Sequence, residues 1–218
     1  MKKLFLAIFF SLFTTLGANV LQDAIDNAPA GSILKLPAGI YQGKITIDKP
    51  LTIIGKEDGV IIDGMGEGTV ITTEGSYITL KNLEIINSGD RNDKIDAAIR
   101  MTKGKQCEIS KCTIRDTLFG IDMQMINNSI VADNYITSKN LSLGLRGDGL
   151  RIWYSNDNII RKNSLIKSRD MVVWYSHGNL IEGNYGEHNR YSLHFMYAGK
   201  NIVKNNEYRY NSVGIFFM

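Results

Sequence analysis

A short pattern of apolar and polar positions recurs along the chain. It consists of an opening residue, two mostly apolar residues, two variable residues and a closing residue that is usually Asn. The closing positions are Asn82, Cys112, Asn134, Asn163, Asn184 and Asn206, which lie 30, 22, 29, 21 and 22 residues apart. A β-rich repeat with a period near 22 predicts a stacked solenoid and not a globule with a single core.

Two apolar columns precede the opening residue of each repeat. Eight positions before it stand Ile99, Ile121, Leu150, Met171, Leu193 and Ile215. Six positions before it stand Met101, Met123, Ile152, Val173, Phe195 and Phe217. Side chains two residues apart on a strand share a face, so both columns should point into the core. Parallel strands with right-handed connections then give an all-β fold, a right-handed parallel β-helix, with the closing residues forming a hydrogen-bonded ladder at one inner corner.

The chain divides into three parts. Residues 1–18 combine two lysines, an apolar stretch and a terminal Ala18, which predicts a secretory signal peptide. Residues 19–76 hold an amphipathic helix over 20–28, which should cap the solenoid, and a set of less regular strands. The apolar face of this helix comprises Leu21, Ala24, Ile25 and Ala28. The irregular strands are expected at 33–36, 44–47, 51–54, 60–62 and 70–72.

Residues 77–218 form the regular coils. The last residues, 214–218, have the pattern of a core strand with no cap after it, so we expect the chain to stop in mid-coil with C-terminal coils missing. Two gaps exceed the period and place insertions at 87–94 and 138–148. Both should leave the same corner of the solenoid, two coils apart. They are either contact sites or tolerated surface loops.

Net charge and the length of apolar segments limit the classes of function that suit the chain. The formal net charge of +3 falls to +1 when Lys2 and Lys3 leave with the signal, so net charge gives no argument for nucleic-acid binding. No later segment approaches ~18 consecutive apolar residues, which predicts a mature protein that is soluble once exported and that meets a membrane only through other proteins.

Cys107 and Cys112 stand at the two ends of one repeat. A straight strand would part their Cα atoms by ~16 Å, well beyond the ~7 Å limit for a disulfide. This spacing favours two small buried residues that replace Ser or Asn in a ladder. A turn inside the segment would still permit a bridge.

An aromatic stripe lies at positions that should face outward between the two core columns. One column reads Thr102, Gln124, Trp153, Trp174, Met196 and Met218, and the next includes Tyr154, Tyr175 and Tyr197. A stripe of large apolar side chains on an outer face predicts a partner-binding surface. Alternatively, the strand turns here and these residues fill a corner of the core.

His194 and Met196 are two residues apart and should share a face, with Met218 one coil away. Imidazole and thioether ligands suit Cu(I), which makes this trio a candidate metal site. A histidine beside methionines is also often simply packed or solvated. No HxH, CxxC or HExxH spacing is present to strengthen the metal interpretation.

Polysaccharide lyases, epimerases and hydrolases commonly use this fold, so carbohydrate chemistry is the alternative function. Such enzymes need clustered acids or a base beside a cation. Here Asp122, Asp148 and Asp170 look scattered, and Arg100, Arg151 and Arg190 complete no familiar set. We therefore predict no catalytic residues. Sugar binding without chemistry, by stacking on the two tryptophans, stays open.

Several segments resemble the NosD family. The N-terminal ones are Leu21-Gln-Asp-Ala-Ile25, Gly39-Ile-Tyr41 and Lys49-Pro-Leu-Thr-Ile-Ile-Gly55. More specific are Gly149-Leu-Arg-Ile-Trp-Tyr-Ser155 and Asn189-Arg-Tyr-Ser-Leu-His-Phe-Met-Tyr197, the second of which is similar to the family's R-Y-G-x-H-Y-M-Y motif.

The resemblance implies a pectin-lyase-like β-helix in the periplasm. It implies an accessory role in denitrification, in the assembly of the copper centres of nitrous-oxide reductase, and not catalysis. The implied partners are the subunits of an ABC-type membrane transporter, a copper chaperone and the reductase itself. Copper is the one cofactor that the resemblance suggests.

Overall fold

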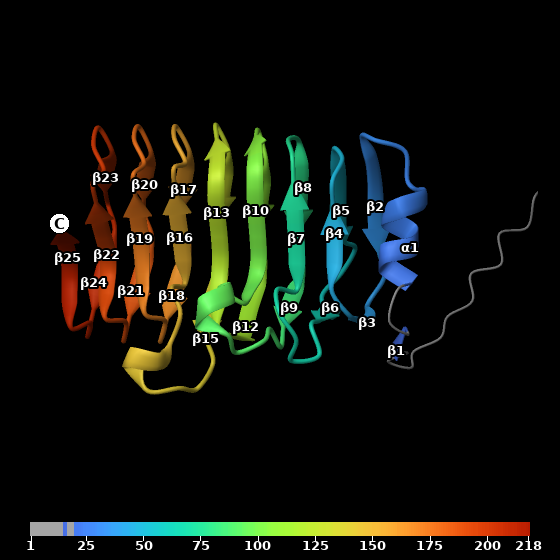
Figure 1. The fold of residues 1–218 in the computed structure, drawn as a ribbon, viewed down its shortest axis with the longest axis horizontal. Coiled ribbons are helices and arrows are strands. Elements are labelled where there is room, and N and C mark those ends of the chain that lie inside the picture. Colours follow the sequence, from blue (N-terminus) through green and yellow to red (C-terminus); the bar gives the residue numbers. More distant parts are fainter. Residues whose placement is uncertain (1–14, 17–19) are drawn as a thin grey trace, which may run out of the picture.

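The computed structural model describes residues 15–16 and 20–218, and it is a parallel β-helix (Figure 1). Within this part of the chain every strand pairing is parallel, and the strands make three sheets, which we call sheets I, II and III. One strand from each sheet makes up one rung. The predicted all-β solenoid is confirmed. The proposed signal peptide lies outside the described residues, apart from the two that form β1.

The sheets are made of the following strands, in spatial order. Sheet I contains β1 (Thr15–Leu16), β3 (Gly39–Gln42), β6 (Val60–Asp63), β9 (Glu84–Ile86), β12 (Thr113–Thr117), β15 (Tyr135–Ser138), β18 (Ser164–Ile166), β21 (Tyr185–Glu187) and β24 (Glu207–Arg209). Sheet II contains β4 (Ile45–Ile47), β7 (Ile71–Glu74), β10 (Ala97–Lys105), β13 (Phe119–Asn127), β16 (Leu150–Trp153), β19 (Asp170–Trp174), β22 (Tyr191–Met196) and β25 (Val213–Phe217). Sheet III contains β2 (Ser32–Leu36), β5 (Leu51–Gly55), β8 (Ile78–Lys81), β11 (Glu108–Ser110), β14 (Ile130–Ala132), β17 (Ile159–Arg161), β20 (Leu180–Glu182) and β23 (Ile202–Lys204).

The two predicted apolar columns lie in sheet II and form part of the core. Ile99 pairs with Ile121, and Met101 pairs with Met123, so that like residues stack from rung to rung. Both columns are buried up to β22. In β25, the outermost strand of sheet II, Phe217 is 72% exposed, although its ring stacks on Phe195 at 5.0 Å.

The predicted ladder of closing residues is present from Cys112 onward. Asn134 Nδ2 donates to Asn163 Oδ1 at 2.9 Å, and the same contact joins Asn163 to Asn184 at 3.0 Å. Asn184 donates in turn to Asn206 at 3.0 Å. The backbone N–H of Cys112 donates to Asn134 Oδ1, so the cysteine stands at the first position of the ladder. Buried amides are thus paired with one another and with the backbone, as burial requires.

Asn82 was wrongly placed in this ladder. Strand β8 pairs with β11 so that Lys81 stands opposite Ser110, which brings Leu83 opposite Cys112. Asn82 instead occupies a left-handed turn at φ 54° and donates to the carbonyl oxygen of Gly55 at 3.0 Å. Asn tolerates positive φ better than most residues, so the same residue type suits both positions and the sequence pattern is misaligned by one.

A second amide ladder was missed. Asn158 Nδ2 donates to Asn179 Oδ1, and Asn179 donates to Asn201, both at 3.0 Å. These are opening residues of the repeat, which the sequence pattern had left unassigned. The repeats that open at Asn158, Asn179 and Asn201 therefore have a paired amide at both ends of the sheet III strand.

Helix α1 (Val20–Asn27) covers one end of the solenoid beside β2, as expected of a cap (Figure 1). Leu21 and Ile25 join the core, but Ala24 is exposed, so the buried face is narrower than the pattern predicted. Among the irregular strands, β3 was missed because Pro37 and Gly39 read as a turn. The thiols of Cys107 and Cys112 are buried and free.

The two insertions leave the same corner, as predicted. They contain the short 3₁₀ helices η1 (Asn92–Lys94) and η2 (Leu143–Leu145), and both lie between a strand of sheet I and the next strand of sheet II. One rung separates them, so both project beside sheet II (Figure 1). Within the described residues, no helix has the length and apolar content that crossing a membrane requires.

Candidate functional site

The outer face of sheet II carries a row of charged residues in register. Strand pairing places Arg100, Asp122 and Arg151 directly above one another on β10, β13 and β16. The same column continues through Val172 to His194 on β19 and β22. Because core side chains alternate with these positions, all of them point away from the core.

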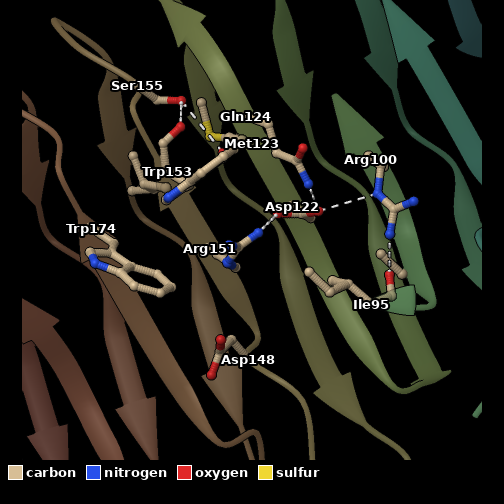
Figure 2. A network of polar contacts seen from close by, with 12 residues as sticks. Ile95, Arg100, Asp122, Met123, Gln124, Asp148, Arg151, Trp153, Ser155 and Trp174 are labelled. Carbon is tan, nitrogen blue, oxygen red and sulfur yellow. Dashed lines mark hydrogen bonds and ion pairs between the residues drawn. The ribbon is translucent and has the colours of Figure 1, made fainter. Parts of the chain in front are cut away.

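Asp122 is the centre of a buried polar network (Figure 2). Its side chain is 0% exposed, and it accepts hydrogen bonds from Arg100 Nε at 3.3 Å, Arg151 Nη1 at 2.9 Å and Gln124 Nε2 at 2.7 Å. A carboxylate removed from water needs such partners, since an unpaired buried charge is strongly destabilising. Arg100 Nη2 also donates to the backbone oxygens of Lys94 and Ile95, and the first of these contacts ties the first insertion to sheet II.

Two further carboxylates lie at the beginning of neighbouring rungs. Asp148 accepts two hydrogen bonds from Arg169, at 2.9 and 3.1 Å, and Asp170 accepts two from Arg190. Burial raises the pKa of the Asp148 carboxyl above its usual value, and the hydrogen bond from Arg169 opposes this shift. The hydrogen bond to Asp170 raises the pKa of Arg190.

The acidic residues are therefore not scattered, contrary to the interpretation of the sequence. Asp122, Asp148 and Asp170 are each paired with an arginine from a neighbouring rung. Arg169 was overlooked altogether. The available signal was the recurrence of Arg and Asp at about one rung's spacing, because residues one rung apart lie side by side in a solenoid.

The predicted aromatic stripe faces outward, beside this charged row. Trp153 pairs with Trp174, which pairs with Met196 on the next rung. The Arg151 guanidinium lies over both indoles, 5.4 and 5.7 Å from their centroids. Figure 2 shows Arg151 beside the two tryptophans. The position is therefore not a corner of the core.

Three tyrosines form the edge of the stripe. Tyr154, Tyr175 and Tyr197 stack with centroids 4.9 and 5.0 Å apart. All three have φ near 48°, a left-handed conformation that costs bulky residues energy and that turns each ring outward. Tyr197 is 62% exposed. Met218 lies one rung beyond, where its backbone oxygen accepts from the N–H of Tyr197 at 3.3 Å.

A cleft of about 460 Å³ lies over the charged row and reaches the stripe. Its lining comprises Asn92, Ile95, Phe119, Asp148, Arg151, Arg169, Asp170, Val172, Trp174, Arg190, His194 and Met196. Two lining atoms, Trp174 Nε1 and His194 Nε2, are buried without a hydrogen-bond partner among the described residues. The repeat pattern did not predict this cleft, because its walls come from both insertions and from four separate rungs.

His194 and Met196 do share a face, as predicted, and both line the cleft. His194 Nδ1 lies 3.2 Å from Asp170 Oδ2. A carboxylate only accepts, so in the neutral imidazole this contact places the proton on Nδ1 and the lone pair on Nε2. Within the described residues there is no group of three or more His, Cys, Asp or Glu side chains placed to bind a metal. A soft ion here would therefore depend on the imidazole and on thioethers.

The fold and this outer face define a protein of the parallel β-helix class. A mannuronan C-5 epimerase module from Azotobacter vinelandii superposes with a TM-score of 0.62 and 15% identity, over 93% of this chain and 71% of that one. A pectin methylesterase in complex with a hexasaccharide gives 0.53 and 15%, over 89% of this chain and 77% of that one. At such identities the likeness concerns the fold alone.

Sequence comparison is more specific. Residues 126–218 match the model of the NosD family, described as "Periplasmic copper-binding protein (NosD)". Relatives from Pseudomonas aeruginosa and Stutzerimonas stutzeri, each named "Probable ABC transporter binding protein NosD", are 29% and 28% identical over 62% of this chain. The chain spans about a third of their length, 32% and 31%. These matches confirm the resemblance to the NosD family.

Proposed function

We propose that this chain is a periplasmic accessory protein in the assembly of the copper centres of nitrous-oxide reductase. It acts as a scaffold whose aromatic stripe, comprising Trp153, Tyr154, Trp174, Tyr175, Met196, Tyr197 and Met218, docks a partner. The partner is a transporter subunit, a copper chaperone or the reductase. One observation carries the proposal: the region that matches the NosD family, residues 126–218, contains the whole stripe.

The chemistry of the stripe supports docking. Large aromatic side chains supply ~150–250 Å² of contact each, and Trp and Tyr dominate the energetics of protein interfaces. Trp153 and Trp174 are half-buried before any partner binds, and stacking fixes the three tyrosine rings. A partner would thus meet a surface that is already ordered, which reduces the entropy lost on binding.

The ion pairs support a role without catalysis. A general acid or base must reach its substrate with a free proton or lone pair. The Asp148 and Asp170 carboxylates are each held by two hydrogen bonds from an arginine, and Asp122 is fully buried. All three serve to join neighbouring rungs.

Direct copper contact forms the second part of the proposal. The buried, unpartnered Nε2 of His194 and the side chain of Met196 line the same cleft, and Met218 follows in the Met196 column. Cu(I) favours soft thioether and imidazole ligands. Asp170 holds the imidazole by its other nitrogen, which is how ligand histidines are commonly oriented.

The docking proposal is tested with a double variant, Trp153→Ala with Trp174→Ala, introduced into the host. We expect the reductase to be made and exported but to lack its catalytic copper centre, with nitrous-oxide reduction lost. The matched control is Ile159→Ala with Leu180→Ala, which shortens two outward residues of the same two rungs on sheet III. This control should leave copper loading intact.

Both double variants must show the circular dichroism of a β-helix for the comparison to hold. A folded stripe variant that still yields a fully copper-loaded reductase would remove the stripe from the proposed function. Equal loss in the sheet III control would indicate a general effect on stability.

A further inference from the structure

The arginines and aspartates that form ion pairs at the cleft are unequal in number. Among the described residues Asp122 pairs with two arginines, Arg100 and Arg151, whereas Asp148 and Asp170 pair with one arginine each. These four arginines and three aspartates together carry one excess positive charge. A largely desolvated excess charge attracts an anion more strongly than an exposed one does.

Arg151 is the residue that can offer this charge to a ligand. Its side chain is 12% exposed and lines the cleft. The one hydrogen bond that its guanidinium makes to a described residue joins Nη1 to Asp122. Its other N–H groups remain to meet a ligand, and a guanidinium fork matches the two oxygens of a carboxylate.

The rest of the cleft lining offers contacts for ligand groups other than a carboxylate. Trp174 Nε1 is a buried donor without a partner, and leaving such a group unpaired costs ~1–3 kcal/mol. The amide of Asn92, from the first insertion, both donates and accepts. Phe119 and Val172 supply apolar parts of the lining.

We propose that the cleft binds a uronic acid unit of an acidic polysaccharide. The carboxylate pairs with Arg151, the ring packs on the apolar parts of the lining, and hydroxyl groups bond to Asn92 and Trp174. A uronate ring carries a carboxylate, several hydroxyl groups and an apolar ring face in one compact unit, which matches the mixture of charged, polar and apolar groups in this lining. The cleft volume of about 460 Å³ lies within the range of small-ligand pockets. This proposal goes beyond the proposed role in copper assembly, whose candidate copper ligands His194 and Met196 line another part of the same cleft.

Calorimetry on the purified chain tests the proposal with tri-galacturonate and trimannuronate, each compared with its methyl ester. The ester keeps the ring and its hydroxyls and adds one methyl group, but it removes the charge. We expect at least one acid to bind, its ester to bind about tenfold more weakly or not at all, and added salt to weaken the binding of the acid.

Variants then locate the site. Arg151→Gln should weaken binding of the acid by about tenfold, because it removes a charged hydrogen-bond donor. The control is Arg161→Gln. Arg161 is exposed at the end of β17, the next strand along the chain, which belongs to sheet III, so this change should have no effect. Thermal unfolding shows whether Arg151→Gln remains folded, and the comparison of acid with ester in the unmodified chain does not depend on it.

Three results would overturn the inference. They are no binding of either uronate, equal binding of acid and ester, or tighter binding of a Gly-Trp-Glu peptide than of the sugars. The last would assign the cleft to a protein carboxylate. Because copper loading of the reductase is measured separately, failure here leaves the docking proposal standing.

Discussion

Replacing Asn163 by Ala should reveal how much the amide ladder stabilises the solenoid. The side chain is fully buried and takes part in four hydrogen bonds. It accepts from the backbone N–H and Nδ2 of Asn134 at 3.1 and 2.9 Å, and it donates to Val131 O and Asn184 Oδ1 at 2.9 and 3.0 Å. The substitution removes all four bonds and leaves the N–H of Asn134 buried without a partner.

The magnitude follows from these contacts. An orphaned buried donor costs ~1–3 kcal/mol and each lost net hydrogen bond ~0.5–1.5 kcal/mol. Two of the former partners keep other hydrogen bonds, which reduces the loss. Asn184 Oδ1 still accepts from the backbone N–H of Asn163, and Asn134 Nδ2 still donates to Ile109 O. We therefore expect the free energy of unfolding to fall by about 3–5 kcal/mol.

Urea unfolding followed by far-UV circular dichroism measures this loss. The control is Asn140→Ala, the same chemical change at an exposed loop position, where surface substitutions shift stability by ~0.5 kcal/mol or less. Hydrogen exchange should localise the destabilisation to the rungs that hold Asn134 and Asn184. A loss below ~1 kcal/mol for Asn163→Ala, or one matched by Asn140→Ala, would refute the reasoning that the ladder is a major stabilising element.

Three further predictions concern single residues. Burial raises the pKa of the Cys112 thiol from 9.0 to about 12. The stability that the protonated thiol contributes is therefore present below pH 9.0 and lost as the pH rises toward 12. Cys112→Ala should flatten this part of the pH dependence of the free energy of unfolding in urea. A Cβ on Gly104 would overlap a backbone carbonyl oxygen of the preceding rung, so Gly104→Ala should cost about 3 kcal/mol in urea unfolding, whereas Gly144→Ala, with open space around it, should be nearly neutral. His194→Gln should abolish Cu(I) binding in a chelator competition that the exposed His177→Gln survives, and unchanged affinity would remove His194 from the proposed metal site.

The repeat pattern was enough to predict the fold because a solenoid obeys local rules. Each rung packs only on its neighbours, so the period of the sequence becomes the period of the structure. The core columns through Met101 and Ile99, the common corner of both insertions and the buried cysteines all follow from counting residues. Counting failed at Asn82, where one residue type suits both a ladder position and a left-handed turn.

The aromatic stripe was also visible in the sequence. Trp153 and Trp174 occupy equivalent positions in successive repeats, and alternation along a strand predicts their outward direction. What alternation could not decide was whether the strand continues or turns at these residues. The structure shows that the chain turns only at the tyrosines that follow.

The cleft was decided by the tertiary structure alone. Its ion pairs join residues such as Asp148 and Arg169, which are far apart in the sequence and adjacent only because successive rungs stack. Asn92 reaches the same space from an insertion whose path no repeat specifies. The order of residues along the chain was enough to specify the rung, its core and its outward stripe, since these depend on the alternation of side chains along strands. Which charges meet across rungs depends on the register of stacking and the path of a loop, and these exist only in the folded chain.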